Sequence, residues 1–442
     1  MQLNLVDWLP AQHIKNSFQS FFKRYFNTNS LISAILLSLP IYLYDFKEIF
    51  LIEIINEISI FFGFYFLITK RASLFWFGFF SALFWFWWVG LSFRYYNLSF
   101  LVPFISLLIA LGYGGIFWIV EKIILYFSKK LKKLYPLPWK KILLIFFIVF
   151  GLEYFKPFTF DWLKFDILFL SFNHFLTKWE FLIFLIGFLF INTRFFYLSF
   201  FFITIPILFS NPTFPKNNIP LKIKLISTNI PQDKKWDKNY IPIEIKENFE
   251  YIKKAIKQKY DIIVLPESAF PLFLNHYPDL MEKLKLLSKK ITIITGALHE
   301  KGNRFYNSSY IFENEKVTIL DKHILVPFGE YIPFPIFQKE INNLFFDGAS
   351  DYATSPNFNT FKIKNIPFIN AICYEATIKE LYKLPPKYII AQSNMAWFMP
   401  SIAPVLQKML IEYYANKYQK IVFHSLNGYK SYIAKPIIKR GK

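Results

Sequence analysis

Three residues of this 442-residue chain stand where apolar runs end, and their side chains have complementary chemistry. Glu267 follows the run Ile262–Leu265, and Cys373 ends the run that begins at Pro367. Lys322 lies between them in the sequence, where a Lys-His pair interrupts an extended apolar stretch. A carboxylate can take the proton of a thiol, and an ammonium ion favours the thiolate and then the oxyanion of an attacked carbonyl. This combination is typical of acyl transfer through a thioester.

The elements that must position these residues follow from hydrophobic periodicity. Short β-branched runs alternate with amphipathic helical patterns in the second half, which predicts a layered α/β domain. Ligands gather beyond the carboxyl ends of strands in such sheets, so Glu267 and Cys373 are expected to face one crevice. The expected strands are Lys224–Ile230, Ile262–Leu265, Ile291–Ala297, Tyr306–Phe312, Val317–Leu320, Pro367–Cys373, Tyr388–Gln392 and Ile421–Leu426. The expected helices are Glu244–Lys257, Leu280–Lys289 and Ala403–Asn416.

The first half of the chain has a different composition. The chain is 54% hydrophobic and 21% aromatic, which is far more than a soluble domain needs for its core. Long apolar runs fill this half, and they predict about seven membrane spans. We therefore expect a helical membrane domain over residues 1–210, a linker at 211–220 and a catalytic domain over 221–442. The seven runs are Leu31–Tyr44, Ile49–Thr69, Ala72–Phe93, Leu98–Val120, Ile142–Phe155, Phe181–Asn192 and Phe195–Phe209.

Basic residues in short loops predict the orientation, because such loops stay in the cytoplasm. Lys and Arg precede the first run and follow the second and the fourth. This spacing places the N-terminus inside, and an odd number of spans then places residues from Asn211 onward outside the cytoplasm. The first run lacks a small-residue cleavage site and is expected to be an anchor.

Composition also excludes several classes of protein. The formal charge is +21, but the basic residues lie at span ends or are scattered, and no nucleic-acid recognition motif is present, so we expect membrane apposition instead. One cysteine and six histidines without a ligand-like pair argue against a zinc site. Taken singly, Cys373 could be a small buried side chain, Glu267 a solvated loop residue and Lys322 a surface lysine. The three residues together, in this order and at these strand ends, indicate a catalytic site far more specifically than any one of them alone.

The motifs around these residues resemble a known superfamily. Leu265-Pro-Glu267, the run Asp321-Lys322-His-Ile-Leu-Val-Pro-Phe-Gly-Glu330 and Cys373-Tyr-Glu375 occur in the order seen in the nitrilase, or carbon–nitrogen hydrolase, superfamily. Their position behind many apolar runs resembles the apolipoprotein N-acyltransferase family. The resemblance implies a polytopic helical membrane domain followed by a nitrilase-like αββα sandwich.

The resemblance also implies roles for individual residues. Glu267 is expected to be the general base, Lys322 the oxyanion stabiliser and Cys373 the nucleophile. Glu330, Tyr374 and Glu375 match supporting positions of the family. Gln232 and Trp236, in a Pro-Gln…Trp-Asp arrangement, and the pair Trp397-Phe398 match substrate- or lipid-contact positions, for which ordinary packing is the alternative.

The activity implied is lipoprotein N-acylation. A fatty acyl chain would pass from a phospholipid to a Cys373 thioester and then to the α-amine of the diacylglyceryl-cysteine at an apolipoprotein N-terminus. No cofactor, metal or nucleic acid is expected, and the protein would be a monomer surrounded by membrane lipids. It would lie in the bacterial inner membrane with its catalytic domain in the periplasm.

Two other functions remain open at this stage. A membrane-anchored amidase or nitrile hydrolase would use the same triad with water as the second nucleophile. Whether the protein is a transferase or such a hydrolase depends on how the thioester is protected from water. A transporter is disfavoured, because few charged residues interrupt the spans, Glu53 and Glu57 being exceptions.

The sequence departs from the family in three places. The family's Asn-Asp-Ala-Trp-Phe-Gly becomes Asn394-Met-Ala-Trp-Phe-Met399, which loses an Asp and a Gly, and a later Gly is shifted by one position to Gly428. A polar tail ends at Lys442, where many members continue into a further span. None of these changes affects the triad.

Overall fold

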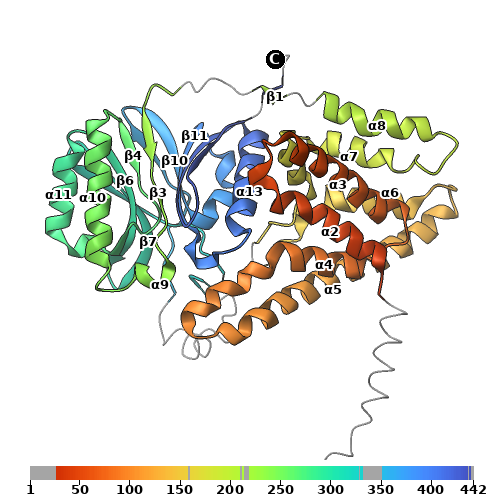
Figure 1. The fold of residues 1–442 in the computed structure, drawn as a ribbon, viewed down its shortest axis with the longest axis horizontal. Coiled ribbons are helices and arrows are strands. Elements are labelled where there is room, and N and C mark those ends of the chain that lie inside the picture. Colours follow the sequence, from red (N-terminus) through yellow and green to blue (C-terminus); the bar gives the residue numbers. More distant parts are fainter. Residues whose placement is uncertain are drawn as a thin grey trace, which may run out of the picture.

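The structure, a computed structural model, describes residues 26–157, 160–209, 212–213, 219–327, 329–331, 351–436 and 438–439. A helical part and a sheet-containing part lie side by side (Figure 1). Most of the expected linker at 211–220 falls outside the described residues. The two-residue strands β1 (Pro212–Thr213) and β14 (Ile438–Lys439) pair with each other beside these gaps.

All seven apolar runs of the first half are largely helical. Several helices continue into 3-10 turns, and α5 extends well beyond its apolar run to the lysines at its end. The helices are α2 (Thr28–Tyr42), η1 (Tyr44–Phe46), α3 (Phe50–Thr69), α4 (Leu74–Phe86), η2 (Trp87–Tyr96), η3 (Ser99–Leu101), α5 (Val102–Lys132), α6 (Trp139–Val149), η4 (Gly151–Tyr154), η6 (Phe165–Phe172), α7 (Lys178–Gly187) and α8 (Phe196–Leu208).

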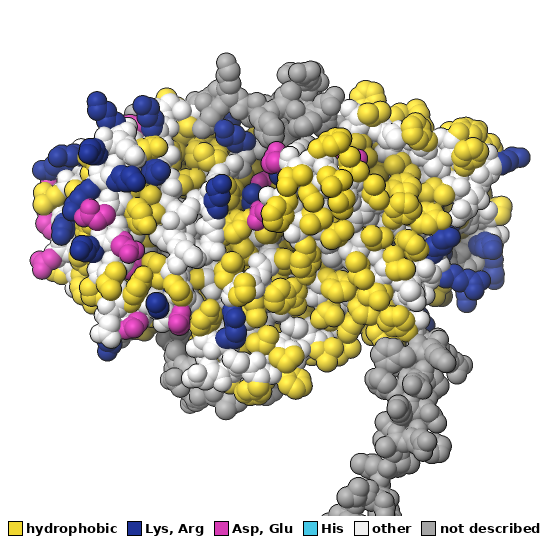
Figure 2. Space-filling model, viewed as in Figure 1, with side chains coloured by type: hydrophobic (Ala, Val, Ile, Leu, Met, Phe, Trp, Pro, Cys, Tyr) yellow, Lys and Arg dark blue, Asp and Glu magenta, His cyan; other side chains and the backbone are white. Residues whose placement is uncertain are grey.

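Three helical stretches are long and apolar enough to cross a membrane among the described residues, namely Phe50–Thr69, Leu74–Tyr96 and Ser99–Lys132. The remaining apolar helices are shorter, so the number of spans stays a prediction. Hydrophobic side chains cover most of the visible face of the helical part, whereas charged side chains gather over the sheet-containing part and at the far end of the helices (Figure 2). Large exposed side chains such as Phe104 and Phe200 face outward, as expected in lipid.

Two six-stranded sheets form the second half. The first has the order β2-β4-β6-β7-β8, with β5 beside β6, and the second has the order β13-β12-β11-β10-β9, with β3 beside β12. The strands of the first sheet are β2 (Ile223–Leu225), β4 (Ile262–Val264), β5 (Phe270–Phe273), β6 (Thr292–Lys301), β7 (Arg304–Glu313) and β8 (Lys316–Asp321). Those of the second are β3 (Ser227–Thr228), β9 (Thr360–Ile363), β10 (Ile366–Ile372), β11 (Tyr388–Asn394), β12 (Ile421–Asn427) and β13 (Tyr432–Ala434).

The two sheets pack face to face between helical layers. Val264 of the first sheet and Phe368 and Phe423 of the second belong to one buried apolar cluster. Helices α10 (Ile241–Lys257) and α11 (Pro278–Ser288) cover the outer face of the first sheet, and α13 (Ala403–Tyr418) covers that of the second (Figure 1). This arrangement confirms the expected αββα sandwich behind a helical membrane part.

The polar residue Gln392 joins the two sheets below the ends of their strands. Its Nε2 donates to Leu265 O at 2.6 Å, and its Oε1 accepts from Ser309 Oγ at 2.6 Å. Because all three groups are buried, each hydrogen bond is costly to lose, and together they fix the relative positions of the sheets.

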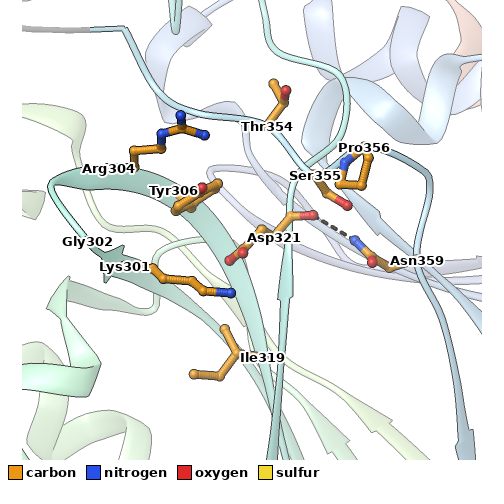
Figure 3. A pocket seen from close by; sticks show the side chains of 10 residues that line it. All are labelled: Lys301, Gly302, Arg304, Tyr306, Ile319, Asp321, Thr354, Ser355, Pro356 and Asn359. Carbon is orange, nitrogen blue, oxygen red and sulfur yellow. Dashed lines mark hydrogen bonds between the residues drawn. The ribbon is translucent and has the colours of Figure 1, made fainter.

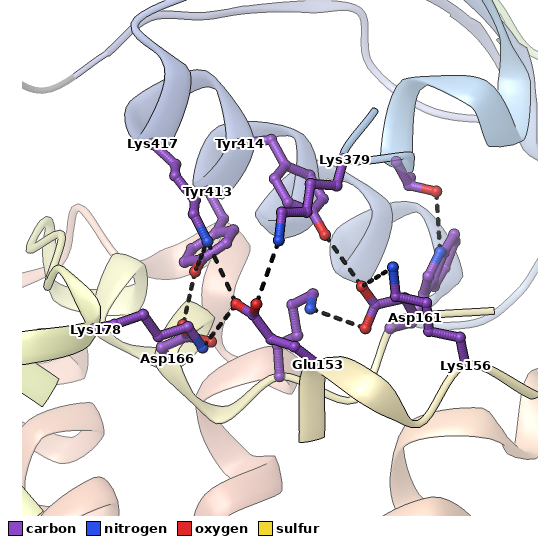
Figure 4. A network of polar contacts seen from close by, with 12 residues as sticks. Glu153, Lys156, Asp161, Asp166, Lys178, Lys379, Tyr413, Tyr414 and Lys417 are labelled. Atoms are coloured by element: carbon purple, nitrogen blue, oxygen red, sulfur yellow. Dashed lines mark hydrogen bonds and ion pairs between the residues drawn. The ribbon is translucent and has the colours of Figure 1, made fainter. Parts of the chain in front are cut away.

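The sheet-containing part docks on the helical part through α13 and through residues 151–157 and 160–178, which we call the interdomain segment. The carboxylate of Glu153 lies 3.4 Å from Lys379 Nζ and 3.3 Å from Lys417 Nζ. Asp166 pairs with Lys178 at 2.8 Å and accepts a hydrogen bond from Tyr413 at 2.7 Å. Figure 4 shows these acidic groups of the segment pointing at cations and hydroxyls of the catalytic domain.

A second polar cluster joins η1 to the same helix. Lys47 pairs with Glu412 at 3.5 Å, and Asp45 pairs with Lys408 at 3.6 Å and accepts from Tyr429 at 2.6 Å. The helical part therefore contacts α13 at two separate ionic clusters, which fix its orientation on the sandwich.

We expect Asp166→Asn to destabilise this docking. The change removes the buried carboxylate that accepts from the Tyr413 hydroxyl and leaves Lys178 with Glu153, at 3.2 Å, as its remaining partner. We expect a loss of roughly 2 kcal/mol, because hydrogen bonds to a buried charged group are lost. The matched control is Glu250→Gln, which breaks the exposed Glu250–Lys253 pair. Thermal melting of the detergent-solubilised protein should show a lower midpoint for Asp166→Asn only; equal midpoints for both variants would contradict the buried pairing.

Candidate active site

The three candidate catalytic residues follow the ends of strands from both sheets. Glu267 comes after β4 and Lys322 directly after β8 of the first sheet, whereas Cys373 comes directly after β10 of the second. Glu267 and Lys322 are buried, and Cys373 is partly exposed. Glu267, Lys322 and Glu330 all influence the pKa of the Cys373 thiol. The sandwich thus brings the expected residues into one site.

Two hydrogen bonds orient the Glu267 carboxylate. Asn307 Nδ2 donates to Oε1 at 2.8 Å, and the backbone N–H of Asn394 donates to Oε2 at 2.7 Å. Burial raises the pKa of Glu267, and Lys322 and the two hydrogen bonds only partly offset this rise. A carboxylate with a raised pKa is better matched to proton transfer near neutral pH.

Glu330 holds the ammonium of Lys322. Lys322 Nζ donates to Glu330 Oε2 at 2.7 Å, and the same oxygen accepts from the Val326 N–H at 2.8 Å. Asn307 Nδ2 also donates to Glu330 Oε1 at 2.8 Å, so one amide joins both carboxylates of the site. Burial alone would lower the pKa of Lys322, but Glu330 and Glu267 raise it well above its usual value, so the side chain stays charged.

The surroundings of Cys373 raise the pKa of its thiol. Burial raises its pKa, and the negative charge of Glu267 raises it further, whereas Lys322 and the N–H of Asn394 act in the opposite direction. A thiol of this kind needs a base to become a nucleophile, and Glu267 is the carboxylate with the largest effect on it. The arrangement is suited to deprotonation during attack.

Glu375 fixes the turn that carries Cys373. The turn η9 (Cys373–Thr377) begins at Cys373, and the Glu375 carboxylate accepts from the backbone N–H groups of Ile372, His323 and Ile324 at 2.8, 2.6 and 3.1 Å. The nucleophile turn is thereby tied to the residues after Lys322. Tyr374 points away from these contacts, and its ring stacks against Trp162 of the interdomain segment.

Gly296 in β6 allows the strand to pass directly behind Glu267. A Cβ at this position would lie 2.4 Å from Ser268 N and 2.7 Å from Glu267 Cα. Both neighbours are backbone atoms that cannot turn aside, so only glycine permits this approach. The general-base candidate is therefore positioned by main-chain packing as well as by hydrogen bonds.

Gln232 lies in the buried base of the site. Its Oε1 accepts from Asn394 Nδ2 at 2.7 Å, and Asn427 Nδ2 donates to Asn394 Oδ1 at 2.8 Å. Gln232 thus supports the end of β11, while its Nε2 has no hydrogen-bond partner among the described residues. Trp236, by contrast, is 40% exposed and stands away from these contacts.

Trp397 and Phe398 belong to η11 (Met395–Phe398) and pack against η2 of the helical part. The Trp397 ring stacks on Tyr96 at 6.1 Å between centroids, and Phe398 meets Trp88 edge-on at 4.9 Å. Arg94 also donates to Met399 O at 2.7 Å. This altered loop therefore joins the end of β11, beside Glu267, to the helical part.

Sequence reasoning missed two residues of the site, Asn307 and Asn394. The sequence gives one indication of Asn307, because this residue begins the polar run Asn307-Ser-Ser309 inside an otherwise apolar strand. Asn394 acts partly through its backbone N–H, which no side-chain pattern reveals. No group of three or more His, Cys, Asp or Glu residues that could hold a metal ion occurs in the part of the chain described here.

A separate polar cavity of about 520 Å³ lies beside the hairpin of β6 and β7 (Figure 3). Lys301, Arg304 and Asp321 contribute its charged groups, and Asn359 Nδ2 donates to Asp321 O at 2.6 Å. Successive side chains of a strand face opposite sides, so Asp321 is directed away from its neighbour Lys322. Neither Glu267 nor Cys373 lines this cavity, and we assign it no catalytic role.

Two family models match the chain. "Apolipoprotein N-acyltransferase integral membrane domain" covers residues 24–211, and "Carbon-nitrogen hydrolase" covers residues 228–420. The fold and the site therefore define an integral membrane protein with a carbon–nitrogen hydrolase domain.

Similar curated proteins match along most of their length. The apolipoprotein N-acyltransferase of Wolinella succinogenes is 35% identical over 92% of this chain and 95% of its own length. That of Campylobacter jejuni is 36% identical over 94% and 93%, and that of Helicobacter pylori is 38% identical over 84% and 85%. The chain belongs to the apolipoprotein N-acyltransferase family.

Solved structures resemble the second half only distantly. An amidase from Nesterenkonia is 10% identical over 50% of this chain and 85% of its own, with a TM-score of 0.38. A carbon–nitrogen hydrolase superfamily protein from Xanthomonas campestris is 15% identical over 47% and 76%, with a TM-score of 0.35. No part of the site's description depends on these structures.

The electrostatics of the site give a direct prediction for Cys373. Lys322→Met removes the cation that lowers the thiol pKa, so less thiolate is present at any given pH, and alkylation by iodoacetamide at pH 8 should slow by roughly an order of magnitude or more. Mass spectrometry of the single cysteine gives the rate. Lys301→Met, which removes a cation of the separate cavity, should leave the rate unchanged; equal rates in both variants would mean that Lys322 does not act on the thiol.

Proposed function

We propose that this protein transfers a fatty acyl chain from a phospholipid to the α-amine of the N-terminal diacylglyceryl-cysteine of apolipoproteins. The observation that carries the proposal is a site in which buried Glu267 and Lys322 adjoin the partly exposed Cys373 and whose neighbouring loop packs against the helical part. The names of the similar proteins support the same activity. Both substrates are lipid-anchored, which explains why a hydrolase-type domain is joined to membrane helices.

In the first step, Cys373 attacks the acyl carbonyl of the phospholipid. Glu267 takes the thiol proton as the S–C bond forms, and Lys322 stabilises the negative charge that develops on the carbonyl oxygen. The C–O bond then breaks, and Glu267 returns the proton to the leaving lysophospholipid. The product is an acyl thioester on Cys373.

In the second step, the α-amine of the lipoprotein attacks the thioester. Glu267 takes a proton from the nitrogen as the N–C bond forms, and the C–S bond breaks. The proton passes to the sulfur, which regenerates the Cys373 thiol and leaves an amide on the lipoprotein. The acyl group arrives already activated as an ester, so the chemistry needs no cofactor.

Glu330 and Asn307 act as supporting groups in this scheme. Glu330 is bound to Lys322 and to a backbone N–H, so its oxygens are already committed to holding the ammonium. Asn307 links Glu330 with Glu267 and so keeps the base and the cation at a fixed separation. Trp236, Trp397 and Phe398 would line the approach of the acyl chains.

The domain arrangement is part of the proposal. Residues 1–210 would form the membrane domain, in the bacterial inner membrane, and residues 221–442 the catalytic domain, on its periplasmic side. The support is the distribution of Lys and Arg among short loops, including the lysines at the end of α5. Lipoprotein precursors with a free α-amine would be met on that side.

The decisive test separates the transferase from a hydrolase. Incubation with phospholipid alone should leave a long-lived thioester on Cys373, seen by intact-protein mass spectrometry as the added mass of one acyl chain and removed by hydroxylamine. A diacylated lipopeptide with a free α-amine should discharge it to an N-acylated product, whereas an N-blocked lipopeptide should not. Cys373→Ala should abolish both steps, and Cys373→Ser should be poor because a hydroxyl is a weaker nucleophile near neutral pH.

The alternative, a membrane-anchored amidase or nitrile hydrolase, predicts a different result in the same assay. Free fatty acid would appear rapidly without any amine, since water would then be the natural acceptor. That outcome would overturn the transferase proposal.

The orientation is tested with single cysteines introduced into the Cys373→Ala background. Lys253→Cys lies on exposed helix α10, and Lys130→Cys lies at the exposed basic end of α5. A membrane-impermeant maleimide added to spheroplasts should label Lys253→Cys at once and Lys130→Cys only after lysis. The reverse order would place the catalytic domain in the cytoplasm.

A further inference from the structure

The nucleophile is held in an unfavourable backbone conformation. Cys373 has a φ of 54°, in the left-handed region that non-glycine residues rarely adopt. Such a residue costs on the order of 1–3 kcal/mol and persists only where its surroundings impose it. The contacts around η9 therefore determine where the sulfur lies.

One side of η9 is fixed within the catalytic domain. Glu375 accepts hydrogen bonds from Ile372 and from the two residues after Lys322, as described above. These bonds hold the middle of the turn against the first sheet. They do not reach Thr377, the last residue of the turn.

The other side of η9 is fixed by the membrane half. Trp162 Nε1 donates to Thr377 Oγ1 at 3.0 Å, and Thr377 Oγ1 donates to Tyr374 O at 2.8 Å. The Tyr374 ring stacks on Trp162 at 6.4 Å and on Phe160 at 6.3 Å, with interplanar angles of 26° and 7°. Trp162 thus contacts the turn by a hydrogen bond to Thr377, 215 positions away in the sequence, and by its ring.

The position of Trp162 is fixed by contacts with neighbouring side chains. It is buried, its ring stacks on Phe160 at 4.9 Å, and it packs against Trp88 at 5.4 Å. Its neighbour Asp161 pairs with Lys164 at 2.8 Å. A side chain fixed in this way can transmit a constraint to the turn without moving.

We propose that Trp162 is a positioning residue for Cys373, contributed by the membrane half and acting through Thr377. The inference deepens the proposed function and rests on it, because the turn matters only if Cys373 is the nucleophile. Trp162 contacts neither Lys322 nor Glu330 in any described interaction. Its effect is on where the sulfur lies, and phospholipid binding does not depend on it.

The test uses the full-length protein and vesicles of phosphatidylethanolamine and phosphatidylglycerol as acyl donor. Trp162→Phe removes the hydrogen bond and keeps an aromatic ring, and Thr377→Val removes the hydroxyl with little change of shape. Each should slow thioester formation about three- to tenfold, the range that the loss of one buried hydrogen bond allows, with an unchanged KM for the donor. Relative to wild type, the double variant should be slower by less than the product of the two single effects, because both changes remove the same bond.

Two further variants separate positioning from general stability. Thr377→Ser keeps the hydroxyl and should restore the rate, and Trp179→Phe changes a tryptophan of the same half that is 68% exposed and should have no effect. Iodoacetamide alkylation of Cys373, measured below the melting midpoint of each variant, should slow in Trp162→Phe and Thr377→Val only.

The outcomes distinguish the inference from the function. If wild-type protein forms no thioester, the proposed function fails, while alkylation still tests the positioning. If wild-type protein forms the thioester and Trp162→Phe forms it equally fast, the positioning role is wrong and the function stands. A lower melting midpoint with unchanged alkylation and unchanged turnover of the folded protein would make Trp162 a packing residue only.

Discussion

Burying the ammonium ion of Lys322 beside a thiol costs free energy, and the neighbouring side chains offset this cost. Lys322 is 1% exposed, so water cannot stabilise its charge. Two carboxylates do so instead, Glu330 by direct contact and Glu267 from a short distance. Each carboxylate must in turn be held apart from the other, and the amide of Asn307 donates to both. The charges of Lys322, Glu330 and Glu267 therefore depend on one another. Removing one of these charged side chains leaves another without its partner in the buried site.

The same dependence extends to the arrangement of the two sheets. Glu267, Asn307 and Lys322 come from the first sheet, whereas Cys373 and the N–H of Asn394 come from the second. A small shift between the sheets would separate the Cys373 thiol from the Glu267 carboxylate, and Gln392 opposes such a shift by bonding to Leu265 and Ser309 across the interface. The helical part further restrains the second sheet, because its two ionic clusters contact α13 on the outer face of that sheet. The helical part thus helps to hold the second sheet, and with it Cys373, in place.

The parts of this architecture that the sequence predicted are those with local signals. The ends of β4, β8 and β10 were visible as apolar runs followed by Glu267, Lys322 and Cys373, and the family motifs placed Glu330 and Glu375. The short strands β5, β9 and β13 were missed because strands of three or four residues show too little alternation to stand out from loops. The contact between Trp162 and Thr377 left no signal at all, since it depends on how two distant segments pack. The number of spans also stays a prediction, because several apolar helices are shorter than a bilayer is thick.

The pairing of β1 with β14 has a consequence for how such a protein could arise. Pro212–Thr213 precede the strands of the sandwich and Ile438–Lys439 follow them, so their pairing brings the two flanks of the domain together. A module with adjacent ends can be inserted into another gene without breaking either sheet, as circular permutation and domain insertion commonly require.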